Sequence, residues 1–364
     1  MDLLRSAPAW LAFSLFVATA RADVGAPDER DASLLALCGP GDEVLAEVAG
    51  RLARRKLGGA SSPAADEITE ELRDAGATFP SARMLALAGA EVRGDETAQR
   101  LKRWVSGTSG RRRCGVGSAD DGRGHGAIVV LAAPAFADVT PVPSVVRPGA
   151  WVTIDALLAP EATGARVLVL GPSGGPRSLL ASHHDGRVVA RFVADRPGKW
   201  LAQIVAELDD GPHPVAEVVV RAGAGDAAEP TVPGASEHAA TDAGTLRAML
   251  SAARASEGLA ALAADGALDR LAARHAAKMA ERGLLAHDAG GGDPADRVEG
   301  AGIVAREVGE NVAHAASLAA AHRMIWASPS HRVNVLSRRF DTVGIGVTRG
   351  KDGSVWCVEL FVAR

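Results

Sequence analysis

Hydrophobic positions follow a helical period near both ends of the chain and a strand period in the middle. In the first third, apolar side chains recur every three or four positions and predict helices over residues 42–55, 66–75 and 81–92. A continuous apolar run over residues 126–132 then predicts a strand. We therefore assign residues 23–138 to an N-terminal α/β module.

The middle of the chain consists of short Val-rich runs separated by Pro-Gly, Gly-Pro and Asp-Gly turn sequences. The predicted strands cover residues 151–157, 166–170, 187–193, 199–207 and 214–221. Short strands at this regular spacing are typical of an immunoglobulin-like β-sandwich, which we assign to residues 139–222. The paired Cys of antibody domains is absent, which leaves the topology open.

The last third returns to the helical period after residues 223–244, a linker rich in Ala, Gly, Pro and acidic residues. The C-terminal module, residues 245–364, has predicted helices over residues 246–255, 267–282 and 318–327, and a predicted strand over residues 355–361. His275 falls on the apolar stripe of the second helix, which predicts a core histidine with its hydrogen bonds satisfied.

Two segments of the chain share one pattern of strand, glycine-rich turn and strand. One begins at Cys114-Gly-Val-Gly and the other at Val343-Gly-Ile-Gly, and each follows a helical segment that carries a Trp, Trp104 or Trp326. The N-terminal module is therefore a candidate degenerate copy of the C-terminal one. Two unrelated hairpins in a Val- and Gly-rich chain would explain the pattern equally well.

The first residues predict export. A short basic start precedes a 14-residue largely apolar run, residues 7–20, and the cleavage-site sequence Ala20-Arg21-Ala22 follows, as in a secretory signal peptide over residues 1–22. A bilayer span needs about 20 apolar residues, and no later stretch qualifies, so we expect a secreted or periplasmic protein with no transmembrane segment after cleavage.

Export permits disulfides. Cys38 and Cys114 share the N-terminal module, and we predict a bridge between them that closes a 76-residue span and contributes ~4.5 kcal/mol in the chain-entropy model. Cys357 lies on a predicted strand, and it could be either a buried free thiol or a reactive nucleophile.

Composition narrows the functional classes. A net charge of −4, only 4% aromatic residues and no Tyr argue against nucleic-acid binding. The chain has 35 Arg, 5 Lys and only two Asn, so Asn311 and Asn334 are conspicuous. Asn311 follows Glu310 directly, and Asn334 comes three residues after His331. At such positions an amide can fix a loop, orient an imidazole or bind a ligand.

Three ionisable residues of the C-terminal module could act together if the fold gathers them, namely His287, Glu310 and His331. Two neutral imidazoles suit a divalent metal such as Zn²⁺, with positions left open for water. Glu310 would then be a third ligand or a base acting on bound water. Without metal, the same groups could transfer protons near neutral pH.

Four motifs around these residues occur in a characteristic order. They are Arg282-Gly-Leu-Leu-Ala-His287, Gly309-Glu310-Asn311, Trp326-Ala-Ser-Pro-Ser-His331-Arg-Val-Asn334, and Val343-Gly-Ile-Gly346 followed by Trp356. The module thus resembles the CAP superfamily of cysteine-rich secretory, antigen-5-type and pathogenesis-related proteins, in particular its disulfide-poor bacterial branch. The resemblance implies an α-β-α sandwich with a central antiparallel sheet and a cleft lined by His287, Glu310 and His331. The family's second Glu, on the helix that carries Trp326, has no counterpart here.

We expect a multidomain chain of mixed α/β and all-β modules, with two functional hypotheses for its last module. In the first, the cleft binds a divalent metal or an extracellular ligand, such as lipid or envelope material, with Asn311 and Asn334 contacting the ligand. In the second, His287, Glu310 and His331 serve a metal-assisted or acid–base hydrolase. The sequence leaves the choice open.

Overall fold

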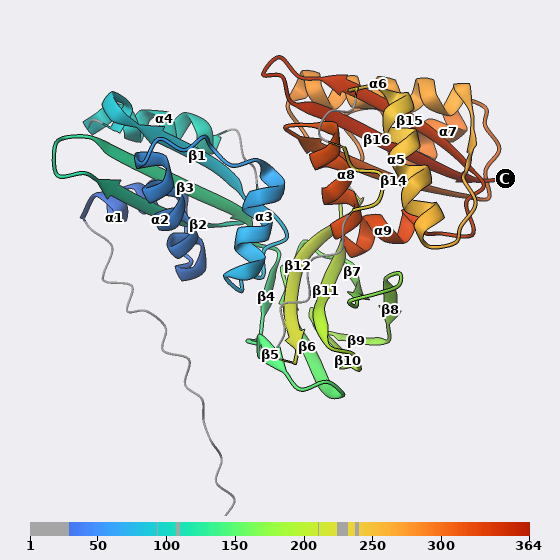
Figure 1. Ribbon diagram of the computed structural model, residues 1–364, viewed down its shortest axis with the longest axis horizontal. Coiled ribbons are helices and arrows are strands. Elements are labelled where there is room, and N and C mark those ends of the chain that lie inside the picture. The colour runs from blue at the N-terminus through green and yellow to red at the C-terminus, as the bar shows by residue number, and fades with distance from the viewer. Residues whose placement is uncertain (1–28, 93, 107–109, 210, 224–231, 237–239) are drawn as a thin grey trace, which may run out of the picture.

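A computed structural model describes residues 29–92, 94–106, 110–209, 211–223, 232–236 and 240–364. Two α/β bodies flank a β-domain, which lies below and between them in Figure 1. The predicted signal peptide and much of the predicted linker fall outside the described residues. Within those ranges, no helix combines the length and apolar character needed to cross a bilayer.

The N-terminal body is a three-stranded antiparallel sheet with helices on both faces. Its elements are α1 (Glu29–Cys38), α2 (Glu43–Leu57), α3 (Ala65–Asp74), β1 (Arg83–Ala88), the 3-10 helix η1 (Gly89–Val92), α4 (Gly94–Ser106), β2 (Arg112–Asp120) and β3 (Gly126–Pro134). The strand order is β1-β3-β2. Alternate residues of β3 enter two cores, one with α2 and α3 and the other with α1 and α4.

The prediction of a helix over residues 81–92 is wrong. Residues Arg83–Ala88 form β1, which pairs antiparallel with β3, and only the short η1 follows. The sequence Met-Leu-Ala-Leu-Ala is rich in good helix formers. Pairing with the buried central strand outweighs that local preference, because β1 gains a full ladder of backbone hydrogen bonds there.

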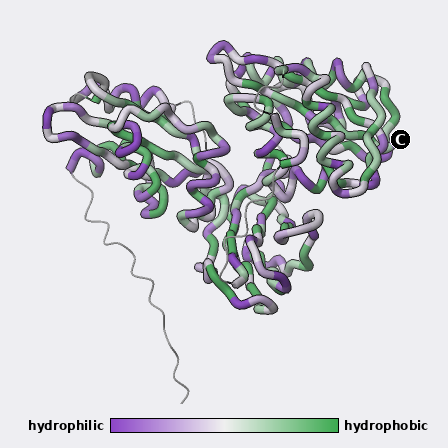
Figure 2. The backbone as a smooth tube through the Cα atoms, in the orientation of Figure 1, coloured by the Kyte–Doolittle hydropathy of each residue, from purple (hydrophilic) through white to green (hydrophobic). Residues whose placement is uncertain are grey.

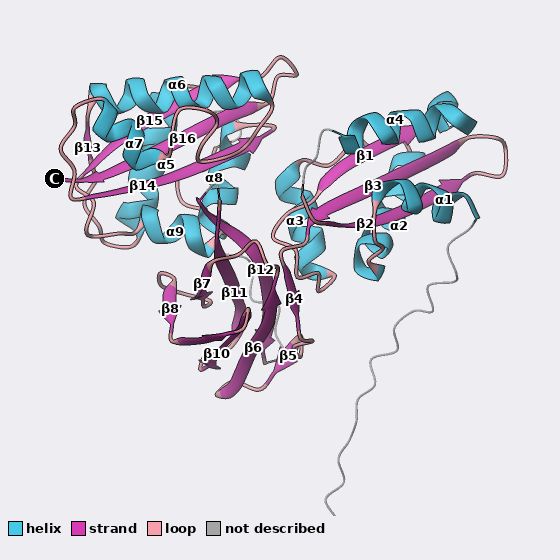
Figure 3. Cartoon of the chain, turned by 180° about the vertical axis from the view of Figure 1, so that it is seen from behind, coloured by secondary structure: helices cyan, strands magenta, loops and turns pink. Residues whose placement is uncertain are grey.

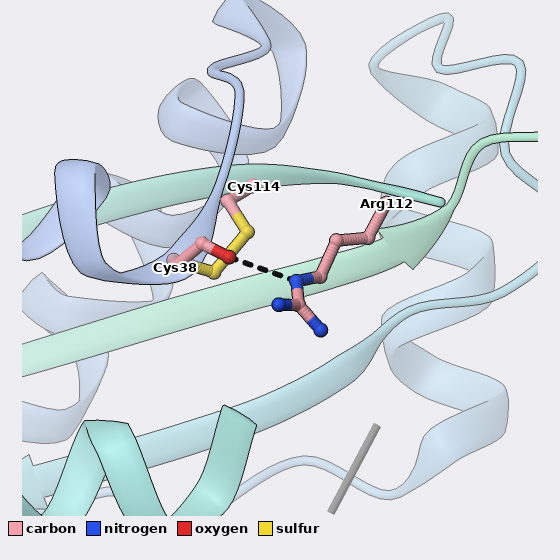
Figure 4. Close-up of a disulfide and its surroundings, with 3 residues drawn as sticks. All are labelled: Cys38, Arg112 and Cys114. Atoms are coloured by element: carbon pink, nitrogen blue, oxygen red, sulfur yellow. Dashed lines mark hydrogen bonds between the residues drawn. A yellow bond between two sulfur atoms is a disulfide. The ribbon is translucent and has the colours of Figure 1, made fainter. Parts of the chain in front are cut away.

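The predicted disulfide between Cys38 and Cys114 is present, with a sulfur–sulfur distance of 2.04 Å. It joins the C-terminus of α1 to β2, and both cysteines are buried. Figure 4 shows Arg112 beside the bridge, where its Nε donates to the backbone oxygen of Cys38 at 2.8 Å. The bridge thus fastens the first described helix to an edge strand.

The central body consists of two facing sheets around one shared core. Its elements are β4 (Ala137–Val139), β5 (Val145–Val146), β6 (Ala150–Leu158), β7 (Gly164–Leu170), β8 (Arg177–Leu179), β9 (Ala181–His184), β10 (Arg187–Ala194), β11 (Gly198–Leu208) and β12 (Gly211–Ala222). The strand orders are β4-β6-β10-β9 and β5-β12-β11-β7-β8. All five predicted strands are confirmed, and their inward residues pack around Trp200 and Phe192.

The C-terminal body has three layers. Its elements are α5 (Ala243–Ser256), β13 (Ala263–Ala264), α6 (Gly266–Arg282), α7 (Pro294–Gly300), β14 (Glu307–Ala315), α8 (Leu318–Ala327), α9 (Pro329–Val335), β15 (Thr342–Arg349) and β16 (Val355–Ala363). The strand order is β13-β15-β16-β14. Residues of β16 alternate between a core with α5 and α8 and a core with α6 and α7. Figure 3 shows α6 along one face of this sheet, and Figure 2 shows apolar segments following the strands.

The three helices predicted in the C-terminal body are present as α5, α6 and α8, with α5 starting three residues before its predicted first residue, whereas α7 and α9 were not predicted. Asp265 caps α6 by accepting from two backbone N–H groups of its first turn, and Gly283 ends the helix at a φ of +62°. The predicted helix over residues 318–327 is α8 without any change of boundary. These local signals fix where the loop that carries His287 starts.

Both α/β bodies bring one helix unusually close to a strand through a Gly-x-Gly sequence. On β15, a Cβ at Gly346 would lie 2.2 Å from the carbonyl carbon of Ala272 in α6. On β2, a Cβ at Gly117 would lie 2.2 Å from the backbone nitrogen of Gly50 in α2. The element order and the strand order also correspond, with β1, β2 and β3 in the places of β14, β15 and β16.

Candidate functional site

The centre of the site is a carboxylate–imidazole pair. Glu310 lies on the edge strand β14, and its side chain is buried. His287 lies in the loop after α6, and its Nδ1 is 2.9 Å from Oε1 of Glu310. The His287 ring is partly exposed, so the pair connects a buried charge with the surface.

The second carboxylate oxygen of Glu310 is held by an arginine. Arg297, on the short helix α7, forms an ion pair with Oε2. Its Nη1 also donates to the backbone oxygens of His287 at 2.6 Å and Gly292 at 2.7 Å. The guanidinium therefore compensates the buried charge of Glu310 and fixes the loop that presents His287.

His275 is the buried histidine that its place on the apolar stripe predicts, and its Nε2 contacts the backbone oxygen of Ala286 at 3.0 Å. The same nitrogen lies 3.8 Å from Oε1 of Glu310, so the ring also borders the site. Burial lowers the pKa of His275, and the charge of Glu310 opposes that shift. Because the His275 ring is then neutral, Arg297 provides the main positive charge that compensates Glu310.

The two Asn residues join helix α9 to the edge strand. Asn334 Nδ2 donates to the side-chain oxygen of Asn311 at 3.0 Å. Asn311 Nδ2 in turn donates to the backbone oxygen of His331 at 3.1 Å and to Oε2 of Glu359 at 2.9 Å. Their hydrogen bonds within the described chain thus position the helix that carries His331.

His331 lies at the same edge of the sheet as the pair but is not bonded to it. Within the described ranges, no hydrogen bond joins its ring to His287 or Glu310. Burial of the imidazole, with a smaller electrostatic effect from His287, lowers the pKa of His331 to about 4. The imidazole is therefore neutral above mildly acidic pH and has a nitrogen lone pair available.

Beneath the edge strand, β16 carries two buried ionisable residues that face the α8 side of the sheet. Burial raises the pKa of Glu359 to about 7, and the hydrogen bond from Asn311 opposes that rise. Burial also raises the pKa of the Cys357 thiol, and the charge of Glu359 adds to this. A buried thiol with a raised pKa is inert, which favours the structural reading of Cys357 over the nucleophile.

The donor set suits a cation held by imidazoles with Glu310 behind them. Both oxygens of Glu310 are engaged, one by His287 and the other by Arg297. A carboxylate on the Nδ1 side of a histidine fixes the tautomer and directs Nε2 outward, as in many metal sites. Among the described residues, no three His, Cys, Asp or Glu side chains already converge as a metal cluster.

Sequence reasoning found His287 and Glu310 but gave no role to the residues that surround them. Arg297 follows a loop rich in Gly and Asp, and nothing local distinguishes it from a solvated arginine. Glu359 lies in an otherwise apolar strand, Val355–Ala363, and this lone acid was a usable signal. The central body also reaches the site, because the ring of His213 on β12 lies 6.3 Å from that of His287, centroid to centroid.

Comparison with known proteins assigns the C-terminal body. Residues 248–361 match the family model for the cysteine-rich secretory protein family, CAP, so the chain contains a C-terminal CAP domain. No curated protein matches the chain.

The solved structures with similarity to the chain include three from different organisms. An outer surface protein of Borrelia burgdorferi is 24% identical, with 33% of this chain and 90% of that chain covered and a TM-score of 0.31. An extracellular SCP-domain protein of Bacillus anthracis is 13% identical, with coverages of 62% and 89% and a TM-score of 0.30. A PKD domain of an M14-like peptidase from a Thermoplasmatales archaeon is 13% identical, with coverages of 24% and 92% and a TM-score of 0.20.

Proposed function

We propose that the CAP domain binds a divalent cation in its cleft, through Nε2 of His287 and the neutral imidazole of His331. The observation that carries the proposal is the 2.9 Å contact between His287 Nδ1 and Glu310. It holds the ring in one tautomer and leaves Nε2 as the nitrogen that can bind a metal. Zn²⁺ is the first candidate, because it takes imidazole ligands and accepts water at the remaining positions.

Glu310 acts in this proposal through His287 rather than as a metal ligand. Its two oxygens are already occupied, and Arg297 compensates its charge, so a carboxylate in the metal shell would first have to break that ion pair. The cation site is therefore neutral in its ligands. That favours metals that bind nitrogen over hard cations such as Ca²⁺, which prefer oxygen ligands.

The test is isothermal titration of Zn²⁺ into the full chain. His287→Ala and His331→Ala should each abolish or strongly weaken binding, and Glu310→Gln should weaken it by about 10–100-fold, as loss of a group behind a ligand does. His125→Ala is the matched control, because His125 is exposed and distant in sequence. Equal affinity in the wild type and in both cleft variants would refute the proposal.

The same carboxylate–imidazole pair favours a second function, acid–base hydrolysis. With Nδ1 held by Glu310, Nε2 of His287 could take a proton from an attacking water and return it to the leaving group. Leu284 and Leu285, just before His287, are exposed and would give an envelope ligand or substrate an apolar rim. Turnover of a peptide, ester or glycan library that disappears in Glu310→Gln would favour the enzyme over the binding protein.

We infer that the protein acts outside the cytoplasm, as a secreted or periplasmic protein. The disulfide between Cys38 and Cys114 supports this placement, since such bridges persist in oxidising compartments. The signal-peptide pattern in the sequence supports it independently. Fractionation of cells that express the full chain, followed by mass measurement of the mature N-terminus, tests both points.

We also propose that the N-terminal body is a CAP-like copy without the chemistry, and that the central body is an immunoglobulin-like sandwich. Met84 pairs with Leu131, which pairs with Gly115, as Glu310 pairs with Leu360, which pairs with Gly344. By that register Met84 replaces Glu310, Leu85 replaces Asn311 and Val130 replaces Glu359. The N-terminal body would then serve as a scaffold. Zn²⁺ titration of a variant in which His287 and His331 are both replaced by Ala should therefore detect no Zn²⁺ binding to the N-terminal body.

A further inference from the structure

The central body contacts the CAP domain beside the cleft. His213 lies near the start of β12, just after the hairpin from β11, and its ring is tilted 57° to that of His287 at 6.3 Å between centroids. Figure 3 shows β11 and β12 extending upward to α9. A residue of another domain thus stands against the imidazole at the centre of the proposed site.

A buried polar chain fixes this contact. Gln203 on β11 is 1% exposed, and its Oε1 accepts from the backbone nitrogen of Ser330 at 2.9 Å. Its Nε2 donates to Oγ of Ser328 at 3.3 Å and to Oε1 of Glu217 at 2.7 Å. Because Ser328 and Ser330 flank the start of α9, the central body holds the helix turn that carries His331.

The series of buried polar side chains continues into the N-terminal body. Glu217, 2% exposed, accepts from Arg73 of α3 through two hydrogen bonds of 2.8 and 3.1 Å. The backbone nitrogen of Glu217 also donates to the oxygen of Thr78 at 2.8 Å. Buried hydrogen bonds therefore hold β11 and β12 against both neighbouring bodies, and His213 lies on β12 four residues before Glu217.

We propose that His213 supplies a third imidazole to the cation held by His287 and His331, so that the site spans two domains. This inference rests on the function proposed above. Metal–nitrogen distances of about 2.0–2.1 Å place the ring centroids of two imidazoles on a tetrahedral ion about 5 Å apart. The observed separation is about 1 Å wider, which side-chain rotation at the beginning of a strand can close.

Three neutral imidazoles with one open position define the class of ligand. They suit divalent Zn²⁺, Cu²⁺ or Ni²⁺ and discriminate against Mg²⁺ and Ca²⁺, which prefer oxygen. Because one ligand comes from the sandwich and two from the CAP domain, the cation also stabilises the contact between them.

The experiment compares Zn²⁺ affinity across variants of the full chain. His213→Ala and His213→Asn should each weaken binding at least about tenfold. His184→Ala is the matched control on the same body, because the His184 side chain is 87% exposed at a hairpin tip, and its affinity should equal that of the wild type. Thermal unfolding without metal checks that the His213 variants remain folded.

The outcomes separate this inference from the function on which it rests. If His287→Ala abolishes binding while both His213 variants retain wild-type affinity, the third ligand is refuted and the two-histidine site stands. If the wild type binds no Zn²⁺, both are refuted. If binding weakens in the His213 variants, the Co²⁺-loaded protein should also show a changed visible spectrum, because that spectrum reports the ligand set. An unchanged spectrum would refute direct ligation.

Discussion

Replacing Glu359 by Gln removes a charge from the centre of the CAP sheet without changing the shape of the side chain. Burial raises the pKa of Glu359 from 4.5 to about 7 in the folded protein. A folded pKa above the unfolded one means that this group's contribution to stability is fully present below pH 4.5 and is lost as the pH rises through 7. The shift corresponds to ~3 kcal/mol.

The predicted difference between the two proteins therefore depends on pH. Near pH 4 the wild type and Glu359→Gln should have similar free energies of unfolding, because both carry a neutral side chain there. By pH 8 the variant should be more stable by ~3 kcal/mol. Gln can still accept the hydrogen bond that Asn311 donates, so the connection to α9 is kept.

Urea unfolding followed by tryptophan fluorescence at intervals between pH 4 and 8 measures this difference. Other titrating groups, such as the buried histidines, are common to both proteins and cancel in the comparison. Glu281→Gln is the matched control, because Glu281 is exposed on α6 and its replacement should give no pH-dependent difference. A stability difference for Glu359→Gln that does not change with pH would refute the reasoning.

Three further predictions follow from the packing and the crosslink. Gly346→Ala should destabilise the CAP domain by about 3 kcal/mol, since its Cβ would meet the rigid backbone of α6. Gly300→Ala is the control, because the space around Gly300 is open. Equal melting temperatures of the Gly346→Ala variant and the wild type would contradict the prediction. Arg73→Ala should lower the free energy of unfolding by about 3–5 kcal/mol, because it leaves the buried charge of Glu217 without its partner. Arg221→Ala should lower it little, because Arg221 forms an exposed ion pair. Calorimetric unfolding of the two variants measures the difference. Reducing the N-terminal disulfide should lower stability by up to ~4.5 kcal/mol, and identical thermal unfolding with and without reductant would argue against it.

Local sequence signals predicted most of the fold. The hydrophobic period predicted helices α5, α6 and α8 of the CAP domain, and Val-rich runs predicted the strands of the sandwich. The failure at residues 83–88 has a clear physical cause, since a segment with helix-favouring residues forms an edge strand when a buried partner strand is available. Local propensity cannot report that partner.

The site was only half predictable. Motif order identified His287 and Glu310, which the fold brings into contact, and His331, which it places at the same edge. Arg297 and Gln203 could not be found in this way, because their significance comes from partners in other elements. Gln203 acts on residues 125 and 127 positions later in the chain. No spacing rule in a single sequence connects such positions.

The hydrogen-bonded series of buried side chains from Arg73 through Glu217 and Gln203 to the start of α9 affects the order in which the three bodies assemble. Arg73 precedes Glu217 by 144 residues, so a chain that emerges from its N-terminus has the compensating cation ready before the acid appears. The CAP-domain partners of Gln203, Ser328 and Ser330, emerge later still. The sandwich can therefore settle on the first body while the chain emerges and then serve as a template on which the last helix of the CAP domain, α9, is completed.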